Sequence, residues 1–252
     1  MREMRGKRAL VTGASRNLGA VIAERLARAG MSVAVNYHTS KSAAEELVAR
    51  LKAETGGTHI AVGGDMANAR EVRAAVRSAV DELGGPIDVL VNNAGPFGIV
   101  PFAEMSDEEW DRVWAANVKA VYVAVREVAA GMKAAGWGRI INVSAVSAYV
   151  RNRSIYGLSK AAIITLTEQL ALELAPEVTV NAVAPGQIQE SLEDLAGFSP
   201  EWAGQVLAKT PAGRLVRRDE LAEIIYLLCT RAFDMVTGVT IPVEGGLRLP
   251  RF

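Results

Sequence analysis

The chain has 252 residues, of which half are apolar and 22% are charged, a composition that excludes an intrinsically disordered or collagen-like protein. Lys plus Arg and Asp plus Glu balance at 28 each, so no net charge attracts nucleic acid or an anionic membrane, and we expect neither as a partner. Because a chain of this length removes roughly three quarters of its unfolded surface from water, we expect one domain over residues 1–252.

Short apolar runs rich in β-branched residues recur along the chain and predict strands. In chain order they cover residues 9–11, 33–35, 60–62, 89–91, 140–143, 178–183 and 239–243. Their nearly continuous apolar character is typical of strands that are buried on both faces of a parallel sheet.

Segments rich in Ala, Leu, Glu and Arg lie between these runs and carry apolar residues at helical spacing. They cover residues 20–29, 42–54, 69–83, 107–135 and 159–175. The alternation predicts an α/β fold, a Rossmann-type doubly wound sheet of about seven parallel strands with helices on both faces. Residues 185–199 carry no clear element, and because they follow a strand at the expected ligand edge, we expect a substrate lid at about 187–212.

The turn after the first strand has the pattern of a nucleotide site. Residues 12–19 read Thr-Gly-Ala-Ser-Arg-Asn-Leu-Gly and open the first helix. Glycines permit a tight turn there, and the free amides of the helix start can face a pyrophosphate. The sequence therefore predicts a dinucleotide cofactor at this turn.

The end of the second strand indicates which dinucleotide is expected. An acidic residue there would bind the 2′-hydroxyl of NAD, but residues 36–41 read Asn-Tyr-His-Thr-Ser-Lys and contain no acid. Arg16 and Lys41 can instead grip a 2′-phosphate, although both can equally be solvated surface charges. We expect NADP(H).

Tyr156 and Lys160 are four residues apart in a helical stretch, which places them on one helix face. A free tyrosine has a pKa near 10, so proton transfer at neutral pH needs a nearby cation, and Lys160 can supply it.

With these motifs the whole chain resembles the short-chain dehydrogenase/reductase family, including its 3-oxoacyl-(acyl carrier protein) reductases. Further matches follow in the family's order: Asn92-Asn93-Ala94-Gly95, Asn117 in Ala116-Asn117-Val118, Pro185-Gly186, and Val243-Glu244-Gly245-Gly246. The resemblance implies that Tyr156 donates a proton, that Lys160 holds the nicotinamide ribose and that Asn117 organises a water relay. The cofactor contacts that we expect, partly from the resemblance, are Gly13, Ser15, Arg16, Asn17, Leu18, Gly19, Asn36, Ser40, Lys41, Asp65, Met66, Asn92, Ala94, Gly95, Tyr156, Lys160, Pro185, Gly186 and Ile188.

Three positions depart from the family pattern. Asn17 stands where the family has its middle glycine, and asparagine tolerates left-handed backbone angles. Glu190 stands where a threonine usually binds cofactor, so either Glu190 points outward or Ser191 takes that role. Ala145 occupies the slot of the catalytic serine when the strands are aligned, and Val143 occupies it when residues are counted back from Tyr156.

A hydroxyl near Ala145 would restore the missing hydrogen-bond donor for the substrate oxygen. Strand alternation turns Ser144 to the opposite face, whereas Ser147 shares the parity of Ala145 but lies beyond the strand. We favour Ser144 as the catalytic replacement.

The expected substrate wall is apolar with a basic edge. It comprises Pro96, Phe97, the loop 149–153 and the lid residues Leu195, Phe198, Trp202 and Leu207, although Phe198 and Trp202 can equally pack a lid helix on the core. Such a wall fits a small-molecule ketone or a 3-oxoacyl chain, while the acidic segment 173–177 disfavours docking of an acidic carrier protein.

The resemblance also implies a homotetramer, or a homodimer, formed through the helices predicted at 107–135 and 159–175. His38 and His59 are isolated, so we expect no metal site. The single cysteine, Cys229, follows an apolar run, and the apolar stretch near the N-terminus is too short for a signal peptide or a membrane span, so we expect a cytoplasmic protein.

These observations predict an NADPH-dependent carbonyl reductase of the short-chain type, with a 3-oxoacyl thioester as one candidate substrate. The alternative is a nucleotide-binding protein with impaired catalysis that acts as a redox-sensing or structural partner. Ala145 and Glu190 motivate this alternative, whereas Tyr156, Lys160 and Asn117 argue for the enzyme.

Overall fold

A computed structural model describes residues 4–98, 100–150, 154–191 and 200–249. Within these ranges seven strands form one sheet of order β3-β2-β1-β4-β5-β6-β7, in which all neighbours are parallel. The strands are β1 (Arg8–Val11), β2 (Ser32–Tyr37), β3 (His59–Gly63), β4 (Val89–Asn92), β5 (Gly138–Val143), β6 (Val178–Pro185) and β7 (Thr240–Val243). Each predicted run contributes one strand, and the predicted fold class is confirmed.

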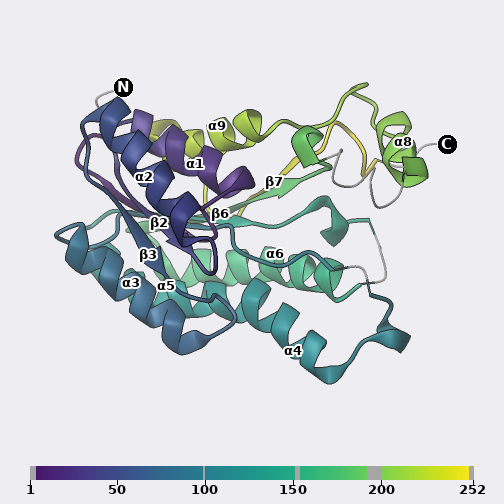
Figure 1. Cartoon of the computed structure of the whole chain (residues 1–252), viewed down its shortest axis with the longest axis horizontal. Helices are drawn as coiled ribbons and strands as arrows, with labels where there is room; N and C mark the ends of the chain where they lie inside the picture. Colours follow the sequence, from purple (N-terminus) through teal and green to yellow (C-terminus); the bar gives the residue numbers. More distant parts are fainter. Residues whose placement is uncertain (1–3, 99, 151–153, 192–199, 250–252) are drawn as a thin grey trace.

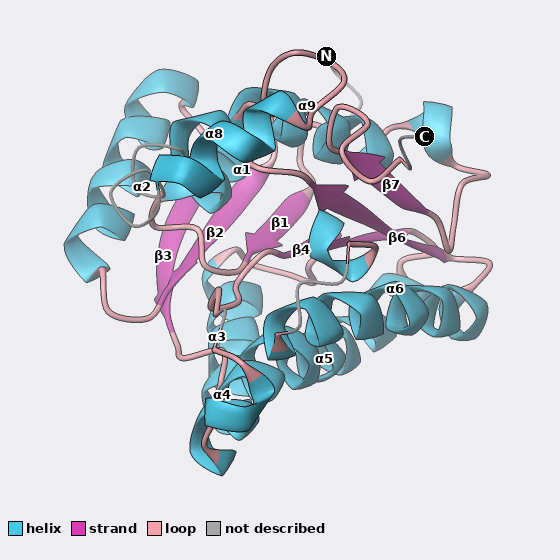
Figure 2. Ribbon diagram, turned by 90° about the vertical axis from the view of Figure 1, so that its right-hand side faces the viewer, coloured by secondary structure: helices cyan, strands magenta, loops and turns pink. Residues whose placement is uncertain are grey.

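Helices cover both faces of the sheet (Figures 1 and 2). One layer consists of α1 (Asn17–Arg28), α2 (Lys41–Thr55) and α9 (Arg218–Cys229), and the other of α3 (Ala69–Glu82), α5 (Ala120–Ala134) and α6 (Ile155–Leu174). Each helix layer packs against one face of the sheet and forms a separate hydrophobic core with it. Strand residues alternate between the two faces, so Val11, Val33 and Val35 lie in the first core, and Leu10 and Ala34 lie in the second.

Shorter elements complete the chain. They are the helices α4 (Asp107–Trp114) and α8 (Pro200–Ala208), the π turn η2 (Ala115–Lys119), and the 3₁₀ turns η1 (Phe102–Glu104), η3 (Val146–Ala148), η4 (Gln189–Ser191) and η5 (Arg231–Phe233). The order of strands reverses between β1 and β4, so the crevice beyond their carboxyl ends is the expected ligand site of this topology.

Two predicted helices have different bounds in the structure. The helix predicted at 107–135 is interrupted by η2, where one turn widens to the π pattern. The helix predicted to begin at Ser159 begins at Ile155, because the hydroxyl of Ser154 accepts a hydrogen bond from the Gly157 amide at 3.1 Å and caps the first turn. Helix α9 was not predicted as an element.

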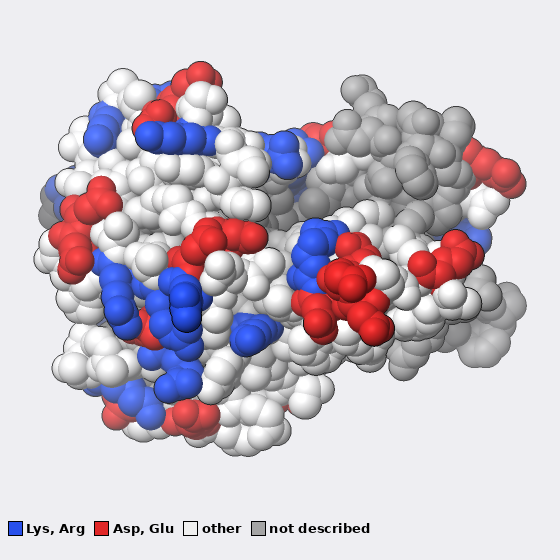
Figure 3. Space-filling view, turned by 60° about the horizontal axis from the view of Figure 1, so that its bottom comes forward, with Lys and Arg blue, Asp and Glu red and all other residues white. Residues whose placement is uncertain are grey.

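The face formed by α3, α4 and α5 carries charges of both signs (Figure 3). Helix α4 begins with Asp107, Glu108 and Glu109, which suit the positive end of its dipole. Arg73 and Arg77 of α3 approach the carboxylate of Glu127 on α5 at 3.4 Å each.

In the part of the chain that the structure describes, no helix has both the length and the apolar character that a membrane crossing requires.

Candidate active site

The glycine turn between β1 and α1 has the backbone geometry that its sequence predicts. Gly13 has φ +61°, and a Cβ at this position would lie 3.0 Å from Cα of Ala94. A Cβ at Gly19 would lie 2.3 Å from the Gly13 carbonyl oxygen, so α1 can pack this closely only through glycine. Asn17 has φ 52°, and among the described residues no other non-glycine residue has a positive φ. Asparagine therefore holds the left-handed position where the family pattern has glycine.

Side chains at the carboxyl ends of three neighbouring strands, β2, β1 and β4, brace this turn. The Thr12 hydroxyl accepts hydrogen bonds from the amides of Asn93 and Ala94, both at 3.0 Å, and the Asn93 side chain donates to the carbonyls of Thr12 and Gly13. The Asn36 side chain accepts from the Gly13 amide at 3.0 Å. These bonds fix the turn at the switch point between β1 and β4.

The side chain of Asn36, a predicted cofactor contact, is used inside the protein. Its side-chain nitrogen donates to the carbonyls of Val62 and Gly64, and only 1% of the residue is exposed. With both ends of the amide bonded inside the protein, Asn36 positions Gly13, and its contact with a cofactor stays a prediction. Asn93 was not among the predicted site residues, although it lies in the Asn92–Gly95 motif.

The first turn of α1 fits the diphosphate of a dinucleotide. Its N-cap, Arg16, makes no side-chain capping bond, so the first N–H groups of the helix lack an intrahelical partner and can bind an anion. Arg16 is exposed, and within the described ranges its guanidinium has no hydrogen bond or ion pair. Lys41, at the start of α2 beside Ser40, is exposed and lies 3.7 Å from Glu45. The residues present at the turn thus fit a phosphate-bearing cofactor.

Two further groups of predicted cofactor residues lie at the ends of β3 and β4. After β3, the Asp65 carboxylate accepts from the Ala67 amide at 2.8 Å, and Met66 is buried. After β4, the Asn92 side chain donates to Asn142 at 2.9 Å, and Asn142 donates to Thr167 of α6. The side chain of Asn92 is therefore part of a buried polar chain that joins two strands to a helix.

Tyr156 and Lys160 lie on one face of α6, as predicted. The ammonium nitrogen of Lys160 is 5.3 Å from the centroid of the Tyr156 ring and donates to the Val143 carbonyl at 2.9 Å. Burial raises the pKa of Tyr156 to about 12 and lowers the pKa of Lys160 to about 8. At neutral pH, Tyr156 therefore carries its proton and Lys160 remains mostly cationic. This is the state that a proton donor with an adjacent cation requires.

Asn117 lies in the π turn η2, where the helix opens beside β4. Its side-chain nitrogen donates to the carbonyls of Pro96 at 3.2 Å and Val113 at 3.0 Å. Its side-chain oxygen is buried and has no hydrogen-bond partner among the described residues. A Cβ at Gly95 would lie 2.2 Å from this oxygen, so the glycine of the Asn92–Gly95 motif makes room for Asn117. The amide thereby ties the π turn to the chain after β4.

Two serines, Ser144 and Ser147, follow β5 and differ in their hydrogen bonds. The Ser144 hydroxyl donates to the Lys160 carbonyl at 2.7 Å, and the residue is 1% exposed. This bond uses the only hydroxyl proton of Ser144, so donation to a substrate, the predicted role, would require the bond to break. Ala145 is also buried, and the Ser147 hydroxyl is buried without a hydrogen-bond partner among the described residues.

The segment after β6 runs alongside the chain that leads into α9. Gly186 donates to the Val243 carbonyl, and a Cβ on Gly186 would lie 2.8 Å from the side chain of Glu244. Ile188 forms a β-bridge with Val216. These contacts place the residues after Pro185 at the same edge of the sheet as the glycine turn.

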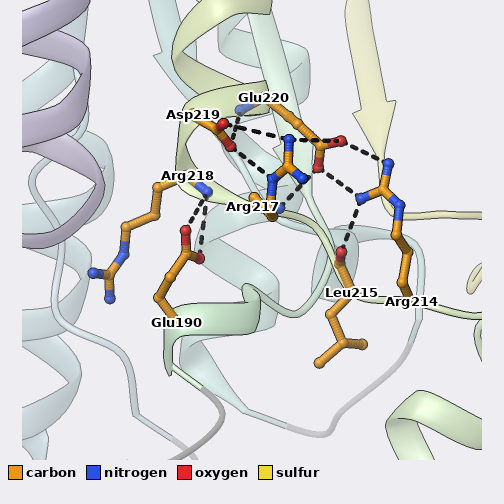
Figure 4. A network of polar contacts seen from close by, with 7 residues as sticks. All are labelled: Glu190, Arg214, Leu215, Arg217, Arg218, Asp219 and Glu220. Atoms are coloured by element: carbon orange, nitrogen blue, oxygen red, sulfur yellow. Dashed lines mark hydrogen bonds and ion pairs between the residues drawn. The ribbon is translucent and has the colours of Figure 1, made fainter.

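The carboxylate of Glu190 is directed at the start of α9. It accepts from the Arg218 amide at 3.1 and 3.3 Å, at the first residue of α9 (Figure 4). Ser191 accepts from the Arg218 guanidinium at 3.1 Å. Glu190 is exposed, as in the alternative in which it points outward.

Phe97 of the predicted substrate wall contacts the tyrosine. Its ring meets the Tyr156 ring edge to face, with centroids 5.0 Å apart, and 56% of Phe97 is exposed. Leu207 is 41% exposed on α8. Leu195, Phe198 and residues 151–153 lie outside the described residues, and so does the side chain of Trp202.

Comparison with known proteins gives similarity over nearly the whole chain. The family described as short chain dehydrogenase matches residues 7–195. The 3-oxoacyl-[acyl-carrier-protein] reductase FabG of Staphylococcus aureus is 39% identical over 244 residues, which cover 96% of this chain and 98% of that protein.

Two solved structures are similar in fold and carry a nicotinamide cofactor. A blue fluorescent protein from a metagenomic library, in complex with NADPH, superposes with a TM-score of 0.88 at 34% identity and covers 97% of this chain and 99% of its own. A gluconate 5-dehydrogenase from Burkholderia cenocepacia, in complex with NADP and tartrate, has a TM-score of 0.90 at 31% identity and covers 99% and 98%.

Proposed function

The chain belongs to the short-chain dehydrogenase family of oxidoreductases, and from this premise we propose that it reduces the carbonyl group of a small molecule with NADPH. The observation that carries the proposal is the pair Tyr156 and Lys160, held on one face of α6 beside the chain after β5. A protein that only binds a nucleotide has no need for a protonated phenol next to a buried ammonium group.

The charges around the glycine turn support NADP(H) over NAD(H). Arg16 is exposed and unpaired at the start of α1 within the described residues, and the chain after β2 contains no acid between Asn36 and Lys41. An arginine fork binds a 2′-phosphate, whereas an acid at this position would repel it. The two similar structures described above contain NADPH and NADP, which agrees with this choice.

The reaction requires a proton donor in addition to the hydride that the bound nicotinamide supplies. Tyr156 starts protonated, because burial holds its pKa at about 12, and it would give its proton to the carbonyl oxygen as negative charge develops there. Lys160 has three N–H donors and uses one on Val143, so two remain for the nicotinamide ribose. Its positive charge would also stabilise the phenolate that Tyr156 becomes.

The chain supplies few other donors for the substrate oxygen. Ala145 has no hydroxyl, and the Ser144 proton is held by the Lys160 carbonyl. We therefore assign the stabilisation of the developing oxyanion to Tyr156, with the buried Ser147 hydroxyl as the remaining serine near the strand end. The exposed ring of Phe97 beside Tyr156 favours an apolar ketone, and the similarity to FabG makes a 3-oxoacyl thioester one candidate.

A cofactor oxidation assay tests the proposal. We expect NADPH, and less NADH, to be oxidised at 340 nm in the presence of some member of a panel of 3-oxoacyl thioesters, diketones and aryl ketones. Tyr156→Phe should lower kcat by at least about a hundredfold, because it removes the proton donor. The variant should still bind NADPH, because the glycine turn and Lys160 are unchanged.

Leu158→Ala is a matched control, since Leu158 is an exposed residue on the same helix. It should keep full activity. Tight NADPH binding without turnover of any substrate would refute the reductase and favour the nucleotide-binding alternative, which Ala145 motivates.

A further inference from the structure

Arg218 differs from the other two arginines of the segment that leads into α9. Arg214 bonds to Glu220, and Arg217 bonds to Asp219 at 3.0 Å. Arg218 forms no ion pair within the described ranges, and its only side-chain bond there is to the hydroxyl of Ser191. Figure 4 shows its side chain extending away from the other labelled charges.

The guanidinium of Arg218 also has an unused donor. Its Nε atom is buried and has no hydrogen-bond partner among the residues that the structure describes. A buried charged donor without an acceptor is unfavourable unless a ligand supplies the acceptor. The side chain is therefore a fixed cation, oriented by Ser191, with bonding capacity left for an anion.

The position of Arg218 follows from the packing of α1 against α9. Arg25, in the second half of α1, pairs with Glu223 and stacks on the ring of Tyr226, both in the second half of α9. Val21, one turn earlier in α1, lines the same cavity of about 530 Å³ as Asp219. The two helices thus lie side by side in the same direction. Arg218 begins α9 at the end where the glycine turn begins α1.

Glu190 lies at the same place, and its carboxylate is directed at the start of α9. Its carboxylate accepts from the Arg218 amide, at the positive end of the α9 dipole. Glu190 thereby attaches η4, the first turn of the predicted lid, to the start of α9. The Arg218 side chain takes no part in this bond and donates to Ser191.

We propose that the guanidinium of Arg218 binds the diphosphate of the dinucleotide, in place of the threonine hydroxyl that the family pattern has at position 190. The inference rests on the proposed function, because it takes a dinucleotide as the ligand. The amide of residue 218 holds Glu190, and the side chain of residue 218 holds the phosphates.

Direct binding measurements test this assignment without turnover. NADPH and NADH are titrated against the wild type and variants by ligand fluorescence, and 2′-AMP, which lacks a diphosphate, is measured by calorimetry. Arg218→Ala keeps the backbone amide for Glu190, so it removes only the guanidinium. We expect it to weaken both NADPH and NADH by a similar factor of about ten or more, and to leave 2′-AMP binding within about twofold.

Two variants serve as controls. Arg217→Ala removes the neighbouring guanidinium, which is already paired with Asp219, and should leave the affinity for both dinucleotides unchanged within about twofold. Arg16→Ala should weaken NADPH and 2′-AMP but not NADH. If Arg218→Ala does not fold, Arg218→Gln keeps most of the side-chain length without the charge and gives the same comparison.

The outcomes separate the two proposals. Retention of NADPH affinity in Arg218→Ala, loss of NADPH affinity without loss of NADH affinity, or an equal loss in Arg217→Ala would each overturn the diphosphate assignment. Failure of the wild type to bind either dinucleotide would instead refute the proposed function itself.

Discussion

Replacement of Lys160 by methionine should change how the stability of the protein depends on pH. Lys160 is 4% exposed, and burial lowers the pKa of its ammonium group from 10.5 to about 8. That difference corresponds to about 3 kcal/mol of penalty for keeping the charged form in the folded protein. Lys160→Met removes the charge and keeps a side chain of similar length.

The sign of the effect follows from proton binding. Between about pH 8 and 10.5 the unfolded chain holds the Lys160 proton and the folded chain has released it, so stability rises with pH in this window. From pH 7 to 9.5 we expect the wild type to gain about 2 kcal/mol in free energy of unfolding relative to Lys160→Met. Tyr156 does not oppose this gain, because its raised pKa destabilises the fold only above about pH 10.

Urea unfolding of the cofactor-free protein at pH 7.0, 8.0, 9.0 and 9.5 measures the difference. Other titrating groups cancel when the variant is subtracted from the wild type. Lys52→Met, on the exposed side of α2, is the matched control and should follow the wild-type profile. Parallel pH profiles for the wild type and Lys160→Met would show that the lysine is not held as a buried charge, and the reasoning would fail.

Two other predictions follow from single residues. Asn17→Ala should lower the free energy of unfolding by about 1 kcal/mol, because alanine fits φ 52° worse than asparagine does. Asn17→Gly should change the free energy of unfolding by less than half of that amount. Equal urea midpoints for the two variants would contradict the left-handed conformation of Asn17. Cys229 should react with a disulfide reagent at pH 8 only as fast as the protein unfolds, because the thiol is buried and burial raises its pKa to about 12. Rapid stoichiometric labelling of the native protein would contradict that burial.

Local patterns in the sequence were sufficient for the strands and for the tyrosine–lysine pair. The β-branched runs needed burial on both faces, which only a sheet covered on both sides provides, and each run became a strand of one sheet. Tyr156 and Lys160 are neighbours on one helix, so their spacing alone brings them together.

The contacts that the sequence did not reveal depend on partners far away in the chain. The Asn36 side chain is used by Gly13 and by β3, and Ser144 is used by the Lys160 carbonyl, and no local pattern reveals either bond. The contact of Glu190 with α9 spans 28 residues. Helix α9 was not predicted, because the apolar run before Cys229 was interpreted as the surroundings of a buried thiol.

The π turn in the long helical segment has a consequence for chain length. A turn closed by i→i+5 bonds holds one residue more than an α-turn, so α4 and α5 together carry an extra residue at Ala115–Lys119. Deleting one residue there would close the wide turn to a regular helix and leave α4 and α5 nearly in register, because the wide turn absorbs the extra residue. The buried valines of α5 would then stay in the core, whereas the turn that places Asn117 against Gly95 would be lost. The extra residue therefore shapes the site and is not needed for the packing of α5.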